Sequence, residues 1–121
     1  MKQLLDTNII LYFLAGKLKK PLLDNEYYVS IITQLELLSY PNLDSKSEYS
    51  IDLFLKEIKV INITPEIITK TIEIRRKFKF KLPDSIIIAT AKVLNLEILS
   101  NDQQFTKFPD INCLSLAIKN L

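Results

Sequence analysis

The chain has no histidine and no tryptophan, and only one cysteine (Cys113) and one glycine (Gly16) among its 121 residues. Without an imidazole, Ser-His-Asp hydrolysis, Cys-His catalysis and histidine-ligated zinc or haem sites are excluded. A single glycine cannot supply a G-x-G-x-x-G dinucleotide turn or a G-x-x-x-x-G-K phosphate loop. Imidazole chemistry and the common nucleotide-binding loops are therefore excluded together.

A lone cysteine cannot form an intrachain disulfide, and the N-terminal segment reaches a carboxylate at Asp6 instead of a signal-peptide core. The longest apolar stretch without a formal charge, Thr7 to Gly16, is about half of what a membrane-spanning helix requires. We therefore expect a cytoplasmic protein without a membrane segment. A chain of 121 residues that is 48% hydrophobic and 25% charged is typical of one compact domain, here residues 1–121.

Short β-branched runs alternate with longer segments of helical period, which favours an α/β fold with a central, mostly parallel sheet flanked by helices. Five strands are predicted: Lys2–Leu5, Tyr27–Ile31, Lys59–Ile63, Glu97–Ser100 and Asn112–Leu116. Helices are predicted over Asn8–Ala15, Thr33–Ser39, Ser45–Ile58, Pro65–Phe78, Pro83–Leu94 and a short turn at Gln103–Lys107. Pro65 and Pro83 stand where a first helical turn tolerates a missing N–H. The pattern indicates one doubly wound, Rossmann-like unit.

Four acidic residues stand near the carboxyl ends of these strands, where open parallel sheets bind their ligands. Asp6 follows the first strand, Glu36 lies early in the helix after the second, Asp84 opens a helix, and Asp102 follows the fourth strand. All four can converge on one edge of the sheet.

Each acid also has a purely structural interpretation. Asp6 and Asp102 are good helix caps, worth typically ~1 kcal/mol, and Glu36 is interpreted equally well as a glutamate at a helix edge facing water. Asp84 heads a nearly all-apolar helix, and a buried carboxylate without a partner costs several kcal/mol. Asp84 therefore needs a partner.

Carboxylates that are forced together repel one another unless a cation neutralises them. Mg²⁺ and Mn²⁺ take oxygen ligands and need no histidine, so this chain could hold one or two of them. The chemistry that follows is metal-assisted attack of water on a phosphodiester.

The four acids and their surroundings resemble PIN-domain nucleases, and most closely toxins of the VapC type. The motifs that carry the resemblance are Leu5-Asp6-Thr7-Asn8, Glu36, the block from Leu82 to Ala91, and the segment from Leu99 to Phe105. Their order and spacing fit the family over essentially the whole chain, and the L-P-D-x-I-I-x-A-x-A block is the most specific piece.

The resemblance implies a PIN-like three-layer fold and an Mg²⁺- or Mn²⁺-dependent endoribonuclease with catalytic Asp6, Glu36, Asp84 and Asp102. In family terms Asp6, Asp84 and Asp102 would hold the metal, Glu36 would bind or orient the attacking water, and Asn8 and Ser100 would support the site. The chain departs from the family pattern at two positions. Many such toxins carry a further acid where Gln104 stands, which puts a second metal site in doubt, and an alanine where Ser85 stands.

Charge placement is compatible with an RNA substrate. If the four site acids are neutralised, the 16 basic residues face 10 remaining acids, a formal charge of +6. A basic run leads into Asp84, and its members could contact phosphates. The predicted RNA-binding residues are Arg75, Arg76, Lys77, Lys79 and Lys81, with Lys17, Lys19 and Lys20 as a second group. Phe78 and Phe80, interleaved with the run, are predicted to pack inward rather than to stack on bases.

The first helix has more apolar surface than one core face requires, through Leu11 to Leu14. It is either fully buried or part of an interface. The family resemblance implies homodimerisation and a VapB-like antitoxin that covers such a groove, with Tyr49, Leu53 and the segment Leu37-Leu38-Ser39-Tyr40 as its walls. Cys113 is predicted to be a core residue of the last strand.

Two other functions remain open on these residues. A PIN-like module could bind RNA or a protein without catalysis, although four intact acids argue against this. The same chemistry could also serve housekeeping RNA processing, which the catalytic residues cannot distinguish from the toxin of a toxin-antitoxin pair.

Overall fold

The computed structural model describes residues 2–22 and 25–119. Its middle layer is a five-stranded, entirely parallel sheet with the strand order β3-β2-β1-β4-β5. The elements in chain order are β1 (Lys2–Leu5), α1 (Thr7–Leu14), β2 (Glu26–Ser30), α2 (Ile31–Leu38), α3 (Ser45–Lys56), β3 (Lys59–Ile61), α4 (Pro65–Lys77), α5 (Leu82–Leu94), β4 (Glu97–Leu99), the 3₁₀ helix η1 (Gln103–Lys107) and β5 (Cys113–Leu114). This confirms the predicted α/β class and the parallel five-stranded sheet.

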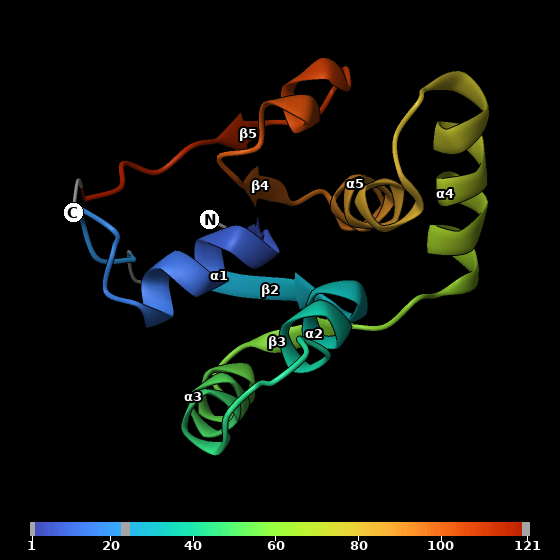
Figure 1. The fold of residues 1–121 in the computed structure, drawn as a ribbon. Coiled ribbons are helices and arrows are strands. Elements are labelled where there is room, and N and C mark those ends of the chain that lie inside the picture. The colour runs from blue at the N-terminus through green and yellow to red at the C-terminus, as the bar shows by residue number, and fades with distance from the viewer. Residues whose placement is uncertain (1, 23–24, 120–121) are drawn as a thin grey trace.

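Helices cover both faces of the sheet, with α1 and α3 on one side and α4 and α5 on the other (Figure 1). Successive residues of a strand point to opposite faces, so Leu4 joins the core under α4 and α5, while Leu5 joins the core under α1 and α3. Burial on both faces is the usual environment of an all-parallel sheet. In the described ranges, no helix combines the length and the apolar character needed to cross a membrane.

The helix α5 is enclosed between the sheet and α4 (Figure 1). Every residue from 85 to 91 is buried, as its nearly continuous apolar sequence predicts. Asp84 lies in the first turn of this helix, just before the buried stretch. The packing of α5 therefore fixes the position of the Asp84 backbone at the N-terminal end of this helix. Phe80 is buried and packs against Phe78, which confirms that these rings turn inward.

The junction between β2 and α2 differs from the prediction. The predicted strand ends at Ile31 and the predicted helix begins at Thr33, but the structure ends β2 at Ser30 and begins α2 at Ile31. The reason is a cap: the Ser30 side chain accepts a hydrogen bond from the backbone N–H of Ile32. The helix therefore starts directly at the strand end, and this brings Glu36 close to the edge of the sheet.

The edge strands are shorter than predicted. β3 ends at Ile61 instead of Ile63, and β5 comprises only residues 113–114. Beyond β5, the backbone of Leu116 pairs with the side chain of Asn101 at 2.7 and 2.9 Å instead of continuing the strand ladder. Because β5 is an edge strand, Cys113 is half-buried at the border of the core and not fully inside it as predicted.

Candidate active site

Four acidic side chains lie where the parallel strands end. Asp6 directly follows β1 and caps α1, and Asp102 follows β4 and caps η1. Glu36 lies on α2 and Asp84 in the first turn of α5. The capping interpretation of Asp6 and Asp102 is confirmed, and it does not conflict with a role at a site, because a cap uses one carboxylate oxygen and leaves the other free for a second partner.

Asp6 is the most deeply buried of these acids, with 7% of its surface exposed. Its Oδ1 accepts a hydrogen bond from the backbone N–H of Thr7 at 2.8 Å, and its Oδ2 accepts one from Ser100 Oγ at 2.7 Å. Burial raises the pKa of Asp6 above its ordinary value, and the nearby charges of Asp84 and Asp102 raise it further, although the two hydrogen bonds act in the opposite direction. The site therefore disfavours the ionised form of Asp6, and a bound cation would stabilise that form.

Asp84 and Asp102 share one donor, the side-chain amide of Gln104. The amide Nε2 lies 2.8 Å from Asp84 Oδ2 and 2.9 Å from Asp102 Oδ2. Burial raises the pKa of Asp84, and the charge of Asp102 adds to this, while the bond from Gln104 and the charge of Lys81 lower it. Gln104 is thus the hydrogen-bond partner of the half-buried Asp84 carboxylate.

Glu36 joins the site through Thr7. The Thr7 hydroxyl donates to Glu36 Oε1 at 2.8 Å, and Thr7 Oγ1 also lies 3.2 Å from Thr33 Oγ1. Both threonines are buried. Neither threonine was predicted to have a role in the site, although Thr7 stands directly after Asp6 in the Leu5-Asp6-Thr7-Asn8 motif.

Hydrogen-bond donors therefore lie between the four acids and link them into one connected set. Ser100 Oγ donates to Asp6 and also accepts the backbone N–H of Asp102 at 3.0 Å, so it links these two. We call the resulting connected set the acidic network; in order along the hydrogen bonds it comprises Asp84, Gln104, Asp102, Ser100, Asp6, Thr7 and Glu36. Ser100 belongs to this network, and its supporting role stays a prediction; Asn8 is exposed and lies outside the network.

The donor set of the acidic network suits a hard divalent cation, because Mg²⁺ and Mn²⁺ prefer carboxylate oxygens. Two of these oxygens, from Asp84 and Asp102, already point at a single atom, the Gln104 amide nitrogen. As they stand, however, no three acidic or cysteine side chains within residues 2–22 and 25–119 are gathered closely enough to hold a metal ion. A cation would therefore have to draw the third ligand inward.

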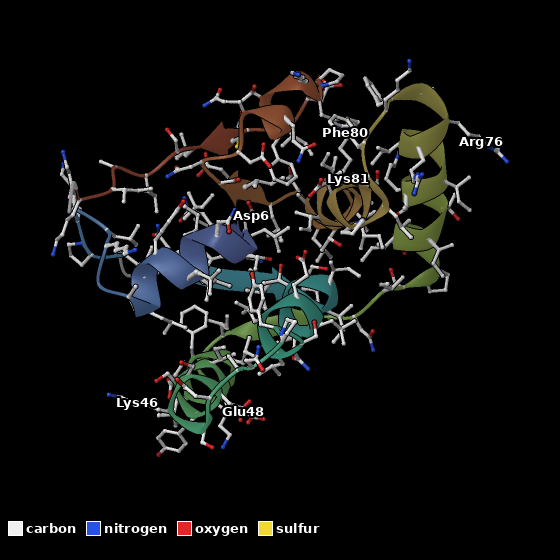
Figure 2. The ribbon with its side chains drawn as sticks, in the orientation of Figure 1. Asp6, Lys46, Glu48, Arg76, Phe80 and Lys81 are labelled. Atoms are coloured by element: carbon white, nitrogen blue, oxygen red, sulfur yellow. The ribbon has the colours of Figure 1, made fainter. Side chains whose placement is uncertain are left out.

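The predicted RNA-binding residues Arg75, Arg76, Lys77, Lys79 and Lys81 are all exposed. Lys81 occupies the N-cap position of α5, three residues before Asp84, and its charge acts to lower the pKa of that carboxyl. Arg76 instead projects outward from α4, on the side of the molecule remote from Asp6 (Figure 2). Of these two, Lys81 is the one beside the acidic network.

A groove of about 490 Å³ runs between α1 and α3; its lining includes the apolar side chains of Leu11, Leu14 and Ile51, small polar side chains, and the charged Lys46. Tyr49 and Leu53, which were predicted as walls of this groove, are exposed on α3 but do not line it, and Phe13 is exposed on α1. The predicted wall formed by the segment from Leu37 to Tyr40 is wrong in part. Leu37 is fully buried in the core, because it points from α2 toward the sheet, and only Tyr40 lines the groove.

The fold and the acidic edge define an α/β domain with a carboxylate site at the carboxyl ends of its parallel strands. The PIN domain family model matches residues 4–111, and the chain belongs to the PIN domain family. This confirms the family on which the predictions rest. No curated protein matches the chain closely enough to count as a relative.

Solved toxin-antitoxin structures share this fold. VapBC2 from Rickettsia felis, bound to a promoter DNA fragment, is 19% identical with a TM-score of 0.80, covering 97% of this chain and 100% of that chain. DNA-bound VapBC from Salmonella typhimurium is 20% identical with a TM-score of 0.82, and the match covers 95% of this chain and 98% of that chain. A toxin-antitoxin complex from Klebsiella pneumoniae is 27% identical with a TM-score of 0.73, and the match covers 90% of this chain and 94% of that chain.

Proposed function

We propose that residues 1–121 act as one nuclease domain, a metal-dependent endoribonuclease that serves as the toxin of a VapBC-type toxin-antitoxin pair in the cytoplasm. The observation that carries this proposal is the acidic network, in which side chains from four separate elements meet at the carboxyl edge of the sheet. Membership of the PIN domain family and the likeness to solved VapBC complexes support it.

Asp6, Asp84 and Asp102 are the proposed ligands of Mg²⁺ or Mn²⁺. When bound, the cation would lower the pKa of a coordinated water and stabilise the charge that develops on the leaving 3′-oxygen of a phosphodiester. The raised pKa values of Asp6 and Asp84 fit this assignment, because both carboxylates gain from a neighbouring positive charge.

Glu36 is the proposed residue that accepts or orients the attacking water. Its side chain is exposed on α2, and Thr7 donates to only one of its two carboxylate oxygens. The second oxygen has lone pairs for a water molecule. Thr7 therefore orients the Glu36 side chain and leaves its second carboxylate oxygen free to bind water. Asn8, exposed in the first turn of α1, is proposed to support the site from the solvent side.

For the RNA substrate, basic side chains supply affinity through phosphates with little sequence preference. Lys81 lies beside the acidic network, and the remaining proposed contacts are Arg75, Arg76, Lys77 and Lys79, all exposed. Because Arg76 projects away from Asp6 (Figure 2), it can contact only RNA that extends across α4.

The proposed antitoxin covers the groove between α1 and α3. The groove presents the apolar side chains of Leu11, Leu14 and Ile51, and the sheet does not cover them. An amphipathic helix of a VapB-like partner would bury it. We also propose that the toxin is a homodimer, as the family resemblance implies.

The test is cleavage of end-labelled total RNA by the purified chain with Mg²⁺ or Mn²⁺, beside a sample with EDTA. We expect discrete fragments with wild type and none with EDTA or with the Asp84→Asn variant. Asp52→Asn is the matched control, because Asp52 is an exposed carboxylate on α3, away from the acidic network, and it should cut like wild type. Absence of metal-dependent cleavage on total RNA, with Mn²⁺ binding intact, would favour a non-catalytic binding module instead.

A further inference from the structure

Gln104 directs the NH₂ group of its side-chain amide at the two carboxylates beside it. The Nε2 atom lies 2.8 Å from Asp84 Oδ2 and 2.9 Å from Asp102 Oδ2, so each of its two protons has one acceptor. The backbone N–H of Gln104 also donates to Asp102 Oδ1 at 3.1 Å. The side chain is half-buried, which limits the competition from water.

Chemistry decides which end of the amide faces the acids. With the amide reversed, Oε1 would lie against two carboxylate oxygens, and three acceptors would face one another without a proton. The nitrogen therefore faces Asp84 and Asp102. It lies at the point on which both carboxylates converge, where a shared cation would also be most favourable.

An amide nitrogen and a cation cannot occupy that point together. Mg²⁺ requires oxygen ligands at about 2.0–2.1 Å, shorter than either hydrogen bond of the amide. For both carboxylates to ligate one cation through these oxygens, the Gln104 side chain must first leave. The neutral amide supplies hydrogen bonds but does not cancel the charge of the two acids, so a cation can replace it.

We propose that Gln104 is a place-holder that competes with the divalent cation for Asp84 and Asp102. The inference rests on the proposed metal-dependent function and adds a regulating residue to the site. Gln104 stabilises the metal-free arrangement of the two acids, and this lowers the affinity of the site for the cation.

The test compares Mn²⁺ binding by calorimetry for the purified wild-type chain and the Gln104→Met variant. Methionine has a similar length and shape, donates no hydrogen bond, and carries a thioether that binds Mn²⁺ poorly. Loss of two charge-assisted hydrogen bonds in a half-exposed site predicts roughly tenfold tighter binding. Gln103→Met, on the exposed neighbouring residue of η1, is the matched control and should bind like wild type.

A second readout does not depend on affinity or on cleavage. In ¹⁵N-labelled wild type, titration with diamagnetic Mg²⁺ should shift the side-chain amide signals of Gln104 as its hydrogen bonds to the acids are lost. The corresponding signals of Gln103 should stay in place. Circular dichroism of Gln104→Met, and of Gln104→Ala as a second variant, establishes that the compared proteins are folded.

Unchanged affinity in both folded variants would overturn the place-holder role while leaving the proposed nuclease intact. Weaker binding would also overturn it, because it would make Gln104 a metal ligand. If wild type binds no Mn²⁺ and cuts no RNA, the proposed function fails as well. The cleavage assay on wild type thus separates failure of this inference from failure of the proposed function.

Discussion

Ser100→Ala removes the hydroxyl that connects two acids of the acidic network. Ser100 is 2% exposed, and its Oγ donates to Asp6 Oδ2 at 2.7 Å and accepts the backbone N–H of Asp102 at 3.0 Å. Alanine leaves almost no cavity, so the change is mainly electrostatic. The buried Asp6 carboxylate would lose the one side chain among the described residues that donates a hydrogen bond to it.

The expected cost follows from the kind of hydrogen bond that is lost. A hydrogen bond to a charged group contributes about 1.5–3 kcal/mol, against about 1 kcal/mol for a neutral pair. We expect Ser100→Ala to lower the free energy of unfolding by about 2 kcal/mol at pH 7, or roughly 8 °C in melting temperature for a chain of this size. Ser85→Ala is the matched control, because Ser85 is fully buried but its Oγ donates only to the neutral carbonyl of Lys81, at 2.9 Å.

The assay is urea unfolding in EDTA at neutral and acidic pH, followed by circular dichroism. The excess cost of Ser100→Ala over Ser85→Ala should shrink as pH falls, because the stronger bond needs the ionised form of Asp6. The raised pKa of Asp6 places this loss above 3.8, the ordinary value for aspartate. Equal costs for the two variants at every pH would refute the argument that the Ser100 bond is charge-assisted.

Three further outcomes are expected. The pKa values of Asp6 and Asp84 are raised in the folded state, so these two carboxyls bind protons more tightly there than in the unfolded chain, and their contribution to metal-free stability should fall as pH rises from 3.8 through the folded values. Urea midpoints of wild type and Asp6→Asn in EDTA check this, and a difference that grows in favour of wild type as pH rises over that window would contradict it. Ile88→Ala, at a fully buried position of α5, should cost about 2–5 kcal/mol by urea unfolding, whereas Ile72→Ala, half exposed on α4, should cost well under half as much. Lys81→Ala should weaken RNA binding uniformly and reduce the slope of log affinity against log salt by about 1, and an unchanged slope in filter binding would remove Lys81 from the interface.

Elements whose causes are local were predictable from the sequence. Pro65 stands in the first turn of α4 and Thr64 caps it by accepting the N–H of Ile67, while α5 begins at Leu82, one residue before the predicted Pro83. Proline geometry and caps act within a few residues, so sequence patterns reveal them. The ends of β2 and β5 were less predictable, because a serine cap and a side chain from another loop decide where pairing stops.

The residue types of the site were also visible, because acids after buried strands are conspicuous in an apolar chain. The roles of three of these acids as metal ligands, and of Glu36 in orienting the attacking water, remain predictions. Gln104 was noticed only as a departure from the family pattern, although it supplies the partner that Asp84 requires. Thr7 was overlooked because a threonine at a helix start usually has a local explanation.

The sequence by itself determined the α/β class, the approximate extent of the strands and helices, and which chemistries are impossible without histidine. These follow from composition and from short-range periodicity, which every segment carries independently of its neighbours. Only the tertiary structure decided which donor meets which acid. Ser100 and Asp6 are 94 residues apart, Thr7 and Glu36 are 29 apart, and Gln104 and Asp84 are 20 apart. A hydrogen bond requires atoms within about 3 Å, and packing of separate elements against a common sheet, not spacing along the chain, brings them to that distance.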